Sequence, residues 1–348
     1  MHDIAILIGR FQPVHNGHLA LLHEALAHAR RVIVIVGSAH QARTPKNPFT
    51  WQERAALLQA SVSADEASRL TVLPVRDYYD EPRWADAVRA AVATQAEAAG
   101  KIALVGHFKD ESSSYLAAFP DWALLRMPRR GRMDSTVLRD AWLGAPAGGA
   151  AQALAPYLRE IPPATATLLT QFANTPEYTA LQEEWQMLRD YRAAWANTPW
   201  PPVFVTVDAL LQCRGQVLLI QRGRAPGKGL WALPGGFLEP HDTLWQSCLR
   251  ELREETGYAL DENALRAALR QVTVFDHPGR SQRGRTLTHV HHFDLGHAPL
   301  PAVRGGDDAA HAQWHPIGDL PAMEALLFED HFHILDRCLG LLPTGTSV

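Results

Sequence analysis

Three glutamates in the C-terminal half stand at spacings that bring carboxylates together. Glu251, Glu254 and Glu255 occupy positions i, i+3 and i+4 of a segment with a helical pattern. Residues at these spacings share one face of an α-helix, and each pair of like charges costs an isolated helix roughly 0.2–0.5 kcal/mol. A hard divalent cation between the oxygens would offset that cost. The pattern predicts a Mg²⁺ site, with Mn²⁺ as an alternative occupant, against the competing interpretation of a solvated acidic helix face.

The ends of this helix can also be predicted. Asp242 is a candidate N-cap, because short polar side chains accept the first amide hydrogens of a helix. Gly257 can end the helix in the left-handed conformation. Leu244, Cys248 and Leu252 recur at helical spacing and are expected to face a core.

A longer pattern surrounds the three glutamates. Five residues separate Gly236 from Asp242, seven more follow, and then comes Arg-Glu-Leu-x-Glu-Glu-x-Gly-Tyr, which starts at Arg250. This resembles the Nudix box of a family that hydrolyses nucleoside diphosphates linked to another group. The family usually has glutamate in place of Asp242 and glycine in place of His241. The resemblance implies that Asp242 supports Arg250 and performs no chemistry.

The same resemblance implies roles for the glutamates. Glu251, Glu254 and Glu255 would bind the metal, and a metal-polarised water would attack one phosphorus of a pyrophosphate. Which glutamate acts as general base stays open. Asp307 and Asp308 are candidates for a further ligand or base from a later loop.

An arginine-rich stretch at residues 275–293 bears on the substrate. Arg280, Arg283 and Arg285 supply enough positive charge to hold a diphosphate, although a polar hairpin turn is the simpler interpretation. The stretch resembles ADP-ribose-type Nudix proteins, so the favoured reaction is hydrolysis of ADP-ribose to AMP and ribose 5-phosphate. The alternatives are another dinucleotide substrate, or a non-catalytic nucleotide-binding module that regulates.

A second motif lies at the N-terminus, where a Gly/Pro/His loop follows an apolar run and opens a helical pattern. Free amides and the positive helix end at such a junction favour a phosphate, and His15 and His18 can donate hydrogen bonds to it. Glycine lets the backbone approach a ligand closely. The other candidate binding residues of this loop are Gly9, Arg10, Phe11 and Gly17.

Hydroxyls and a guanidinium recur together further along the chain. Ser135 and Thr136 lie near a predicted helix start, with Arg139 about one turn later. Together with His-x-Gly-His, this resembles the nucleotidylyltransferase superfamily. The implied reaction is in-line attack by a mononucleotide phosphate on the α-phosphorus of ATP. Catalysis would come from positioning and charge stabilisation by His15, His18, Arg139 and Mg²⁺.

Further matches resemble the archaeal-type nicotinamide mononucleotide adenylyltransferases, which form NAD and pyrophosphate. Trp84 would stack on the nicotinamide ring, unless it is an ordinary core aromatic, and Asp80 could instead cap a turn. Nicotinate mononucleotide as acceptor, or another nucleotide donor, stays open. The matching residues, implied to bind substrate, are Ser38, Arg43, Lys46, Asn47, Asp80, Trp84, Lys109 and Asp110.

The elements that must position these residues alternate in type over the N-terminal part. Short apolar runs at 4–8, 32–36, 73–75 and 102–105 flank a helical pattern at 19–29. Buried strands alternating with helices predict a parallel sheet with βαβ crossovers. We therefore expect a Rossmann-like α/β nucleotidylyltransferase domain over residues 1–145.

The pattern changes after residue 145. Ala- and Pro-rich sequence with a helical stretch at 178–195 predicts a helical connector over 146–200. Apolar runs on both sides of Arg214 and Gly215 predict a β-hairpin. It opens an expected α+β Nudix domain over 201–342, a mixed sheet sandwiched by helices, with a flexible tail at 343–348. This domain order resembles bifunctional adenylyltransferase/Nudix proteins.

Composition limits the other function classes. A length of 348 residues favours two domains, and a net charge of -4 gives no general attraction to nucleic acid or anionic membrane. The three cysteines lack metal-ligand spacing, and no apolar run approaches the roughly 20 residues of a membrane span. We expect a cytoplasmic enzyme, compatible with a homo-oligomer, whose partners are ATP, nicotinamide mononucleotide, NAD and ADP-ribose.

Overall fold

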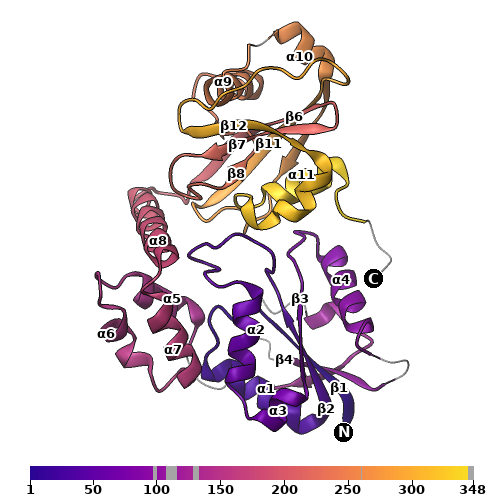
Figure 1. The fold of residues 1–348 in the computed structure, drawn as a ribbon, viewed down its shortest axis with the longest axis vertical. Coiled ribbons are helices and arrows are strands. Elements are labelled where there is room, and N and C mark those ends of the chain that lie inside the picture. The colour runs from indigo at the N-terminus through magenta and orange to yellow at the C-terminus, as the bar shows by residue number, and fades with distance from the viewer. Residues whose placement is uncertain (97–99, 107–115, 128–132, 260, 344–348) are drawn as a thin grey trace. The chain divides into compact units, whose positions relative to one another are not determined.

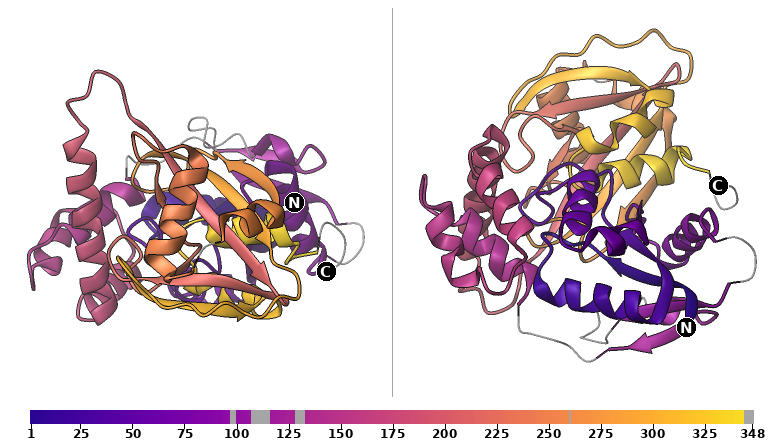
Figure 2. Two further views of the ribbon diagram at one scale, coloured as in Figure 1. Left: turned by 90° about the horizontal axis from the view of Figure 1, so that it is seen from above. Right: turned by 60° about the horizontal axis from the view of Figure 1, so that its bottom comes forward.

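The computed structural model describes residues 1–96, 100–106, 116–127, 133–259 and 261–343 (Figure 1). The chain folds into two compact units, Met1–Gln182 and Glu183–Thr344. We call them the N-terminal and C-terminal units. The chain passes from one to the other within α8 (Pro176–Ala194), a single continuous helix (Figures 1 and 2).

The N-terminal unit contains a five-stranded sheet with the order β3-β2-β1-β4-β5, in which every pair is parallel. The order reverses between β1 and β4, so the switch point, where ligands bind in such sheets, lies at the carboxyl end of β1. The predicted parallel α/β sheet is confirmed. The strands are β1 (His2–Gly9), β2 (Ala29–Val36), β3 (Leu70–Pro74), β4 (Ile102–Gly106) and β5 (Ala123–Arg126).

Sequence analysis missed β5. It is an edge strand of four residues whose two ends are exposed, so it lacks the continuous apolar run that marks a central parallel strand. The other four strands lie at the predicted apolar runs.

Both faces of this sheet are covered. Ala5 and Leu7 of β1 pack on the side of α1 (Asn16–His28) and α2 (Trp51–Ala60), while Ile4 and Ile6 pack on the side of α4 (Glu81–Ala93). Successive side chains of a strand point to opposite faces, so a strand buried on both sides is apolar throughout. The short helix α3 (Ala64–Ser68) precedes β3.

A group of helices completes the N-terminal unit: α5 (Ser135–Leu143), α6 (Ala150–Leu154), η2 (Ala155–Tyr157), α7 (Pro163–Phe172) and the first part of α8. Trp142 is fully buried among them, and its Nε1 donates to the Leu169 carbonyl at 3.1 Å. The Tyr178 hydroxyl donates to the Trp142 carbonyl at 2.6 Å. The segment expected to be a separate connector is thus divided between the two units.

The C-terminal unit contains a mixed sheet of seven strands with the order β10-β11-β6-β7-β12, to which β8 adds on β7 and β9 on β6. Among the described strands of this sheet, β6 and β11 pair in parallel and the other pairs are antiparallel. Arg214 and Gly215 both have positive φ, 51° and 72°, as a tight hairpin requires, so the predicted hairpin is confirmed. The strands are β6 (Val203–Cys213), β7 (Gln216–Arg222), β8 (Trp231–Ala232), β9 (Gly235–Phe237), β10 (Leu269–Phe275), β11 (Arg285–Asp294) and β12 (Ala309–Pro316).

Helices cover both faces of the mixed sheet, as predicted. Leu249 and Leu252 of α9 (Leu244–Thr256) and Leu265 of α10 (Glu262–Ala268) pack on one face. Phe332 and Leu335 of α11 (His331–Leu339) pack on the other, beside η3 (Ile317–Leu326). No helix among the described residues is long and apolar enough to cross a membrane. The expected flexible tail lies outside the described residues, apart from Pro343.

Candidate active sites

The loop after β1 holds two histidine rings together. The Nδ1 atom of His15 accepts from the amide of Gly17 at 3.1 Å, and the Nδ1 atom of His18 accepts from the amide of His15 at 3.3 Å. The two rings stack with centroids 3.8 Å apart. Because both Nδ1 atoms accept a hydrogen bond from a backbone amide, each neutral ring carries its own proton on Nε2. The loop therefore presents two Nε2–H donors side by side.

The first amides of α1 have partners within the chain. The amide of Asn16 donates to the Glu160 carbonyl at 2.9 Å, that of Gly17 to the His15 ring, and that of His18 to the His15 carbonyl at 2.9 Å. These three amides are therefore engaged within the chain, and phosphate binding at this junction stays a prediction. The imidazoles are the donors that this loop offers to an anion.

The buried Phe11 ring packs between the core and the histidines of this loop. Phe11 has a positive φ of 53° and is 1% exposed, with its ring edge-on to His18 at 5.0 Å. A Cβ on Gly9 would lie 2.9 Å from the Phe11 ring, which explains the glycine. Phe11 was predicted to bind substrate, and the structure places its ring in the core beneath the histidines.

The Ser-Thr-x-x-Arg motif meets this loop from α5. Arg139 donates to the Gln12 carbonyl at 2.6 Å and to the Thr136 hydroxyl at 3.2 Å, while the Ser135 hydroxyl donates to the Pro13 carbonyl at 3.1 Å. Burial, and then the charge of Arg10, lowers the pKa of Arg139 to about 10. The guanidinium stays charged at neutral pH. The structure thus brings together the two motifs that resemble the nucleotidylyltransferases.

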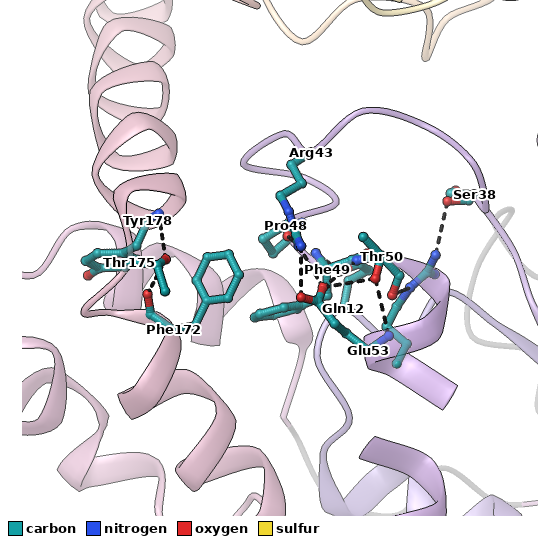
Figure 3. A network of polar contacts seen from close by, with 11 residues as sticks. Gln12, Ser38, Arg43, Pro48, Phe49, Thr50, Glu53, Phe172, Thr175 and Tyr178 are labelled. Carbon is teal, nitrogen blue, oxygen red and sulfur yellow. Dashed lines mark hydrogen bonds and ion pairs between the residues drawn. The ribbon is translucent and has the colours of Figure 1, made fainter. Parts of the chain in front are cut away.

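The loop after β2 is held by a network around Arg43 (Figure 3). Arg43 makes a bidentate pair with Glu53 at 2.7 and 2.8 Å, donates to the Pro48 carbonyl and lies 5.1 Å from the Phe172 ring centroid. Burial would raise the pKa of Glu53, but hydrogen bonds from Arg43 and Thr50 lower it. Arg43, a predicted substrate contact, is thus engaged by Glu53.

Other predicted contacts lie near the same loop. The Ser38 hydroxyl donates to Asp77 at 2.7 Å, and the Asn47 side chain is buried and donates to the Gln41 side chain at 3.3 Å. Lys46 is exposed. Substrate binding by these residues stays a prediction.

Asp80 and Trp84 have structural contacts around the start of α4. Asp80 is the N-cap and accepts from the Arg83 amide at 2.9 Å, so its alternative role as a cap is confirmed. Trp84 is half-buried, packs against the core and meets the Phe119 ring edge-on at 5.8 Å. Stacking of Trp84 on a nicotinamide stays a prediction. Lys109 and Asp110 lie outside the described residues.

Sequence analysis gave no role to the side chains that tie these loops together, although Gln12 and Arg54 both lie in the matched motifs. Arg54 is 1% exposed and donates to the carbonyls of Arg10, Gly37 and Ser38 at 2.6 to 3.1 Å. The Gln12 amide forms a two-way pair with the backbone of Phe49. No periodicity marks these residues, because their partners are distant in sequence.

In the C-terminal unit, α9 carries the three glutamates. Its N-cap is Thr243 and not Asp242, because Thr243 and Gln246 exchange hydrogen bonds as a capping box. The Asp242 carboxylate instead accepts from Arg250 Nε at 3.3 Å, so its predicted support of that arginine is confirmed. Gly257 ends the helix with φ 61°, as expected.

The glutamates lie in different surroundings. Glu251 and Glu254 both pair with Arg250, at 3.0 and 2.9 Å. Glu255 is 2% exposed and accepts from the Gly235 amide at 2.8 Å. Burial raises the pKa of Glu251 and raises that of Glu255 well above its usual value, and the nearby charge of Asp308 acts in the same direction. Asp308, one of the two later candidates, therefore lies near these glutamates. We call Glu251, Glu254, Glu255 and Asp308 the acidic site.

Comparison with known proteins places these two sites in one family. The chain matches the cytidylyltransferase-like family over residues 6–113 and the NUDIX domain family over residues 202–338. A crystal structure titled as a bifunctional NMN adenylyltransferase/ADP ribose pyrophosphatase from Francisella tularensis is 36% identical, with a TM-score of 0.88, and the match covers 98% of this chain and 99% of that one. The chain belongs to this bifunctional family.

Relatives that match one half of the chain are also similar. The nicotinamide/nicotinic acid mononucleotide adenylyltransferase of Acinetobacter baylyi is 38% identical over 141 residues, which are 40% of this chain and 75% of that protein. The ADP-ribose pyrophosphatase of Methanocaldococcus jannaschii is 34% identical over 119 residues, which are 34% of this chain and 65% of that protein.

The acidic site fits the divalent metal that this bifunctional family's Nudix chemistry needs. Buried carboxylates with raised pKa values would gain most from a hard cation, and oxygen is the ligand such cations prefer. As the described side chains stand, no three His, Cys, Asp or Glu residues are close enough to hold a metal, and Arg250 bridges Glu251 and Glu254 instead. Binding of an ion by Glu251, Glu254, Glu255 and Asp308 stays a prediction.

Gly236 of the Nudix box leaves room for the Glu251 carboxylate. A Cβ at Gly236 would lie 2.4 Å from Glu251 Oε1, so Gly236→Ala must displace this carboxylate while the backbone stays in place. We expect pyrophosphate hydrolysis to fall about 10- to 100-fold, since misplacement by about 1 Å can cost this much, with unchanged thermal unfolding. Gly318→Ala, where an added Cβ meets no atom within 4 Å, is the matched control. Full hydrolysis by Gly236→Ala would contradict the assignment.

The predicted diphosphate arginines have separate partners. Arg280 makes a bidentate pair with Asp330 at 2.8 and 2.9 Å, with both side chains at most 5% exposed. Arg283 lies 4.9 Å from the Phe237 ring centroid, and Arg285 donates to the Asp276 carbonyl. Diphosphate binding by these residues stays a prediction.

The Arg280 pair has a consequence for stability. Arg280→Met leaves the Asp330 carboxylate buried without its partner, which typically costs about 3–5 kcal/mol. We expect denaturant unfolding of the full-length chain to show this loss in the transition of the C-terminal unit. Arg266→Met, which breaks an exposed pair with Glu262, should cost less than about 1 kcal/mol. Equal losses of unfolding free energy in the two variants would show that the buried pair contributes no more to stability than the exposed pair.

Proposed function

We propose that the N-terminal unit transfers the adenylyl group of ATP to nicotinamide mononucleotide, giving NAD and pyrophosphate. We further propose that the C-terminal unit hydrolyses ADP-ribose to AMP and ribose 5-phosphate. The observation that carries this proposal is the near-complete match to the Francisella tularensis protein, which is named for both activities. Both motifs also have their side chains assembled here, around His15 and His18 and around Glu251 and Glu255.

The proposed adenylyl transfer needs no protein nucleophile. The acceptor phosphate attacks the α-phosphorus of ATP, and pyrophosphate leaves with the bond electrons. The Nε2–H groups of His15 and His18 would donate to the phosphates, and the charged Arg139 would stabilise the negative charge that builds up. A divalent cation supplies further charge neutralisation when bound.

The proposed hydrolysis depends on the acidic site. When bound, a divalent cation supplies Lewis acidity and a water of lowered pKa. Glu251, Glu254, Glu255 and Asp308 would hold it, with Glu255 fixed by the Gly235 amide and Arg250 held by Asp242. We propose Mg²⁺ as the physiological ion; a second Francisella tularensis structure is titled as a complex with AMP and a manganese ion.

We also propose which residues contact the substrates, from the family match and from the contacts that each side chain makes. We assign Arg43 and Arg280 to positioning, because each is engaged by a carboxylate. The proposed partners are ATP, nicotinamide mononucleotide, NAD and ADP-ribose, and we propose a cytoplasmic location. The residues proposed to contact nucleotide are Gly9, Arg10, Gly17, Ser38, Lys46, Asn47, Trp84, Ser135, Thr136, Arg283 and Arg285.

A substrate panel on the full chain tests the proposal. NAD formation is measured with ATP, Mg²⁺ and either nicotinamide or nicotinate mononucleotide as acceptor. AMP release is measured separately with ADP-ribose, NADH and a dinucleoside polyphosphate. No product from nicotinamide mononucleotide would contradict the first activity. AMP release only from another dinucleotide, or from none, would contradict the second.

A further inference from the structure

One peptide group of the loop after β1, between Val14 and His15, is hydrogen-bonded through both its carbonyl and its amide. The carbonyl of Val14 accepts from the Thr165 hydroxyl at 2.9 Å. The amide of the same peptide group, at His15, donates to His18 Nδ1 at 3.3 Å. Thr165, this peptide and the His18 ring therefore form one chain of hydrogen bonds, and such chains polarise each linking group.

Thr165 is far from the loop in sequence and completely buried. It lies on α7, within residues 114–201, which neither matched family covers. Thr165 and Val14 are both 0% exposed, so water cannot replace the hydrogen bond between the Thr165 hydroxyl and the Val14 carbonyl. Loss of the hydroxyl would leave a buried carbonyl unsatisfied.

The residue after His15 is also held by the chain segment just before α7. The amide of Asn16 donates to the Glu160 carbonyl, and its side-chain amide donates to the Arg159 carbonyl, both at 2.9 Å. The residues before and after His15 are thus both anchored by the stretch at 159–165. Trp142 fixes α7 in turn, through its bond to the Leu169 carbonyl.

We propose that Thr165 is a positioning residue of the adenylyltransferase site. It orients the Val14–His15 peptide, whose amide holds His18 in the tautomer with the proton on Nε2. The helical segment around α7 is therefore part of this site and not a passive connector. The inference rests on the NAD synthesis proposed above.

The test uses the full chain with Thr165→Val, which keeps the volume of the side chain and removes the donor. We expect kcat for NAD synthesis to fall about 10- to 100-fold, with a smaller change in KM for ATP, as for loss of orientation. Thr165→Ser keeps the hydroxyl and should restore most of the rate. Thr170→Val is the matched control, because Thr170 is an exposed threonine of the same helix whose hydroxyl donates to the Ala166 carbonyl one turn earlier.

Two further measurements separate positioning from damage to the fold. ADP-ribose hydrolysis by the same preparation should be unchanged. ¹⁵N spectra of the histidine rings, with His18 assigned through His18→Ala, should show a smaller share of the Nε2–H tautomer of His18 in Thr165→Val. A merely structural role would lower the yield of folded protein and leave that tautomer unchanged.

Wild-type kcat in Thr165→Val, or an unchanged His18 tautomer in the folded variant, would overturn the inference. If Thr165→Val does not fold, the same measurements on Thr165→Ala decide. A wild-type chain that makes no NAD would contradict the proposed function instead, so the two failures are distinguishable.

Discussion

Replacing His18 with alanine is expected to lower NAD synthesis about 100- to 1,000-fold, the usual cost of removing one preorganised donor to developing charge. His18 Nδ1 is held by the His15 amide, so the ring presents Nε2–H in a fixed direction. The His18 ring also stacks on His15 and contacts the Phe11 ring, so removal of the His18 ring changes contacts within the loop after β1. NAD formation at saturating ATP and nicotinamide mononucleotide measures the effect.

His23→Ala is the control for this variant. His23 lies on the same helix, half-exposed, and its nearest charged partner is Glu66 at 3.7 Å. It should make NAD at the wild-type rate, and both variants should hydrolyse ADP-ribose normally. A His18→Ala protein with full NAD synthesis would remove His18 from the site.

Glu255→Gln is expected to lower ADP-ribose hydrolysis at least about 100-fold, the lower end of what a lost metal ligand or general base costs. The change replaces one carboxyl oxygen of a buried site with an amide nitrogen, while the remaining oxygen can still accept from the Gly235 amide. The fold should therefore persist. AMP release over a range of Mg²⁺ concentrations measures both the rate and the apparent metal affinity.

The control is Glu262→Gln on α10, an exposed carboxylate that pairs with Arg266 and Trp245. It should leave hydrolysis unchanged. NAD synthesis should stay at the wild-type level in both variants. Wild-type AMP release by Glu255→Gln would exclude Glu255 from the reaction and leave Glu251 and Glu254 as the candidates.

Local spacing in the sequence was enough to single out candidate residues for both sites, and the chemistry expected of them came from the resemblance to two known families. Glu251, Glu254 and Glu255 share a helix face because of the helical period alone, and Gly257 ends that helix because it can adopt positive φ. The parallel sheet was likewise predictable, since strands buried on both faces are apolar throughout. Such features depend on residues that are neighbours along the chain.

The capping of the two active-site helices was predicted less well. Thr243 caps α9 although Asp242 stands beside it, because Gln246 completes a reciprocal pair with Thr243 while Arg250 engages Asp242. His15 caps α1 with its ring, a role that the usual capping residues do not suggest. In α9, the partners Gln246 and Arg250 on the helix itself decided which side chain became the cap.

The tertiary structure alone decided which distant groups meet. Arg43 with Glu53, Arg280 with Asp330, and Thr165 with Val14 are pairs that no period or motif connects. A buried polar group must find a partner, but the sequence does not say which one, because the choice follows from how the elements pack. The sequence by itself therefore indicated the candidate reactive groups and the helix or loop that carries each of them. Tertiary packing determined what holds these groups in place, and in the N-terminal unit the helical segment at 146–182 takes part in it.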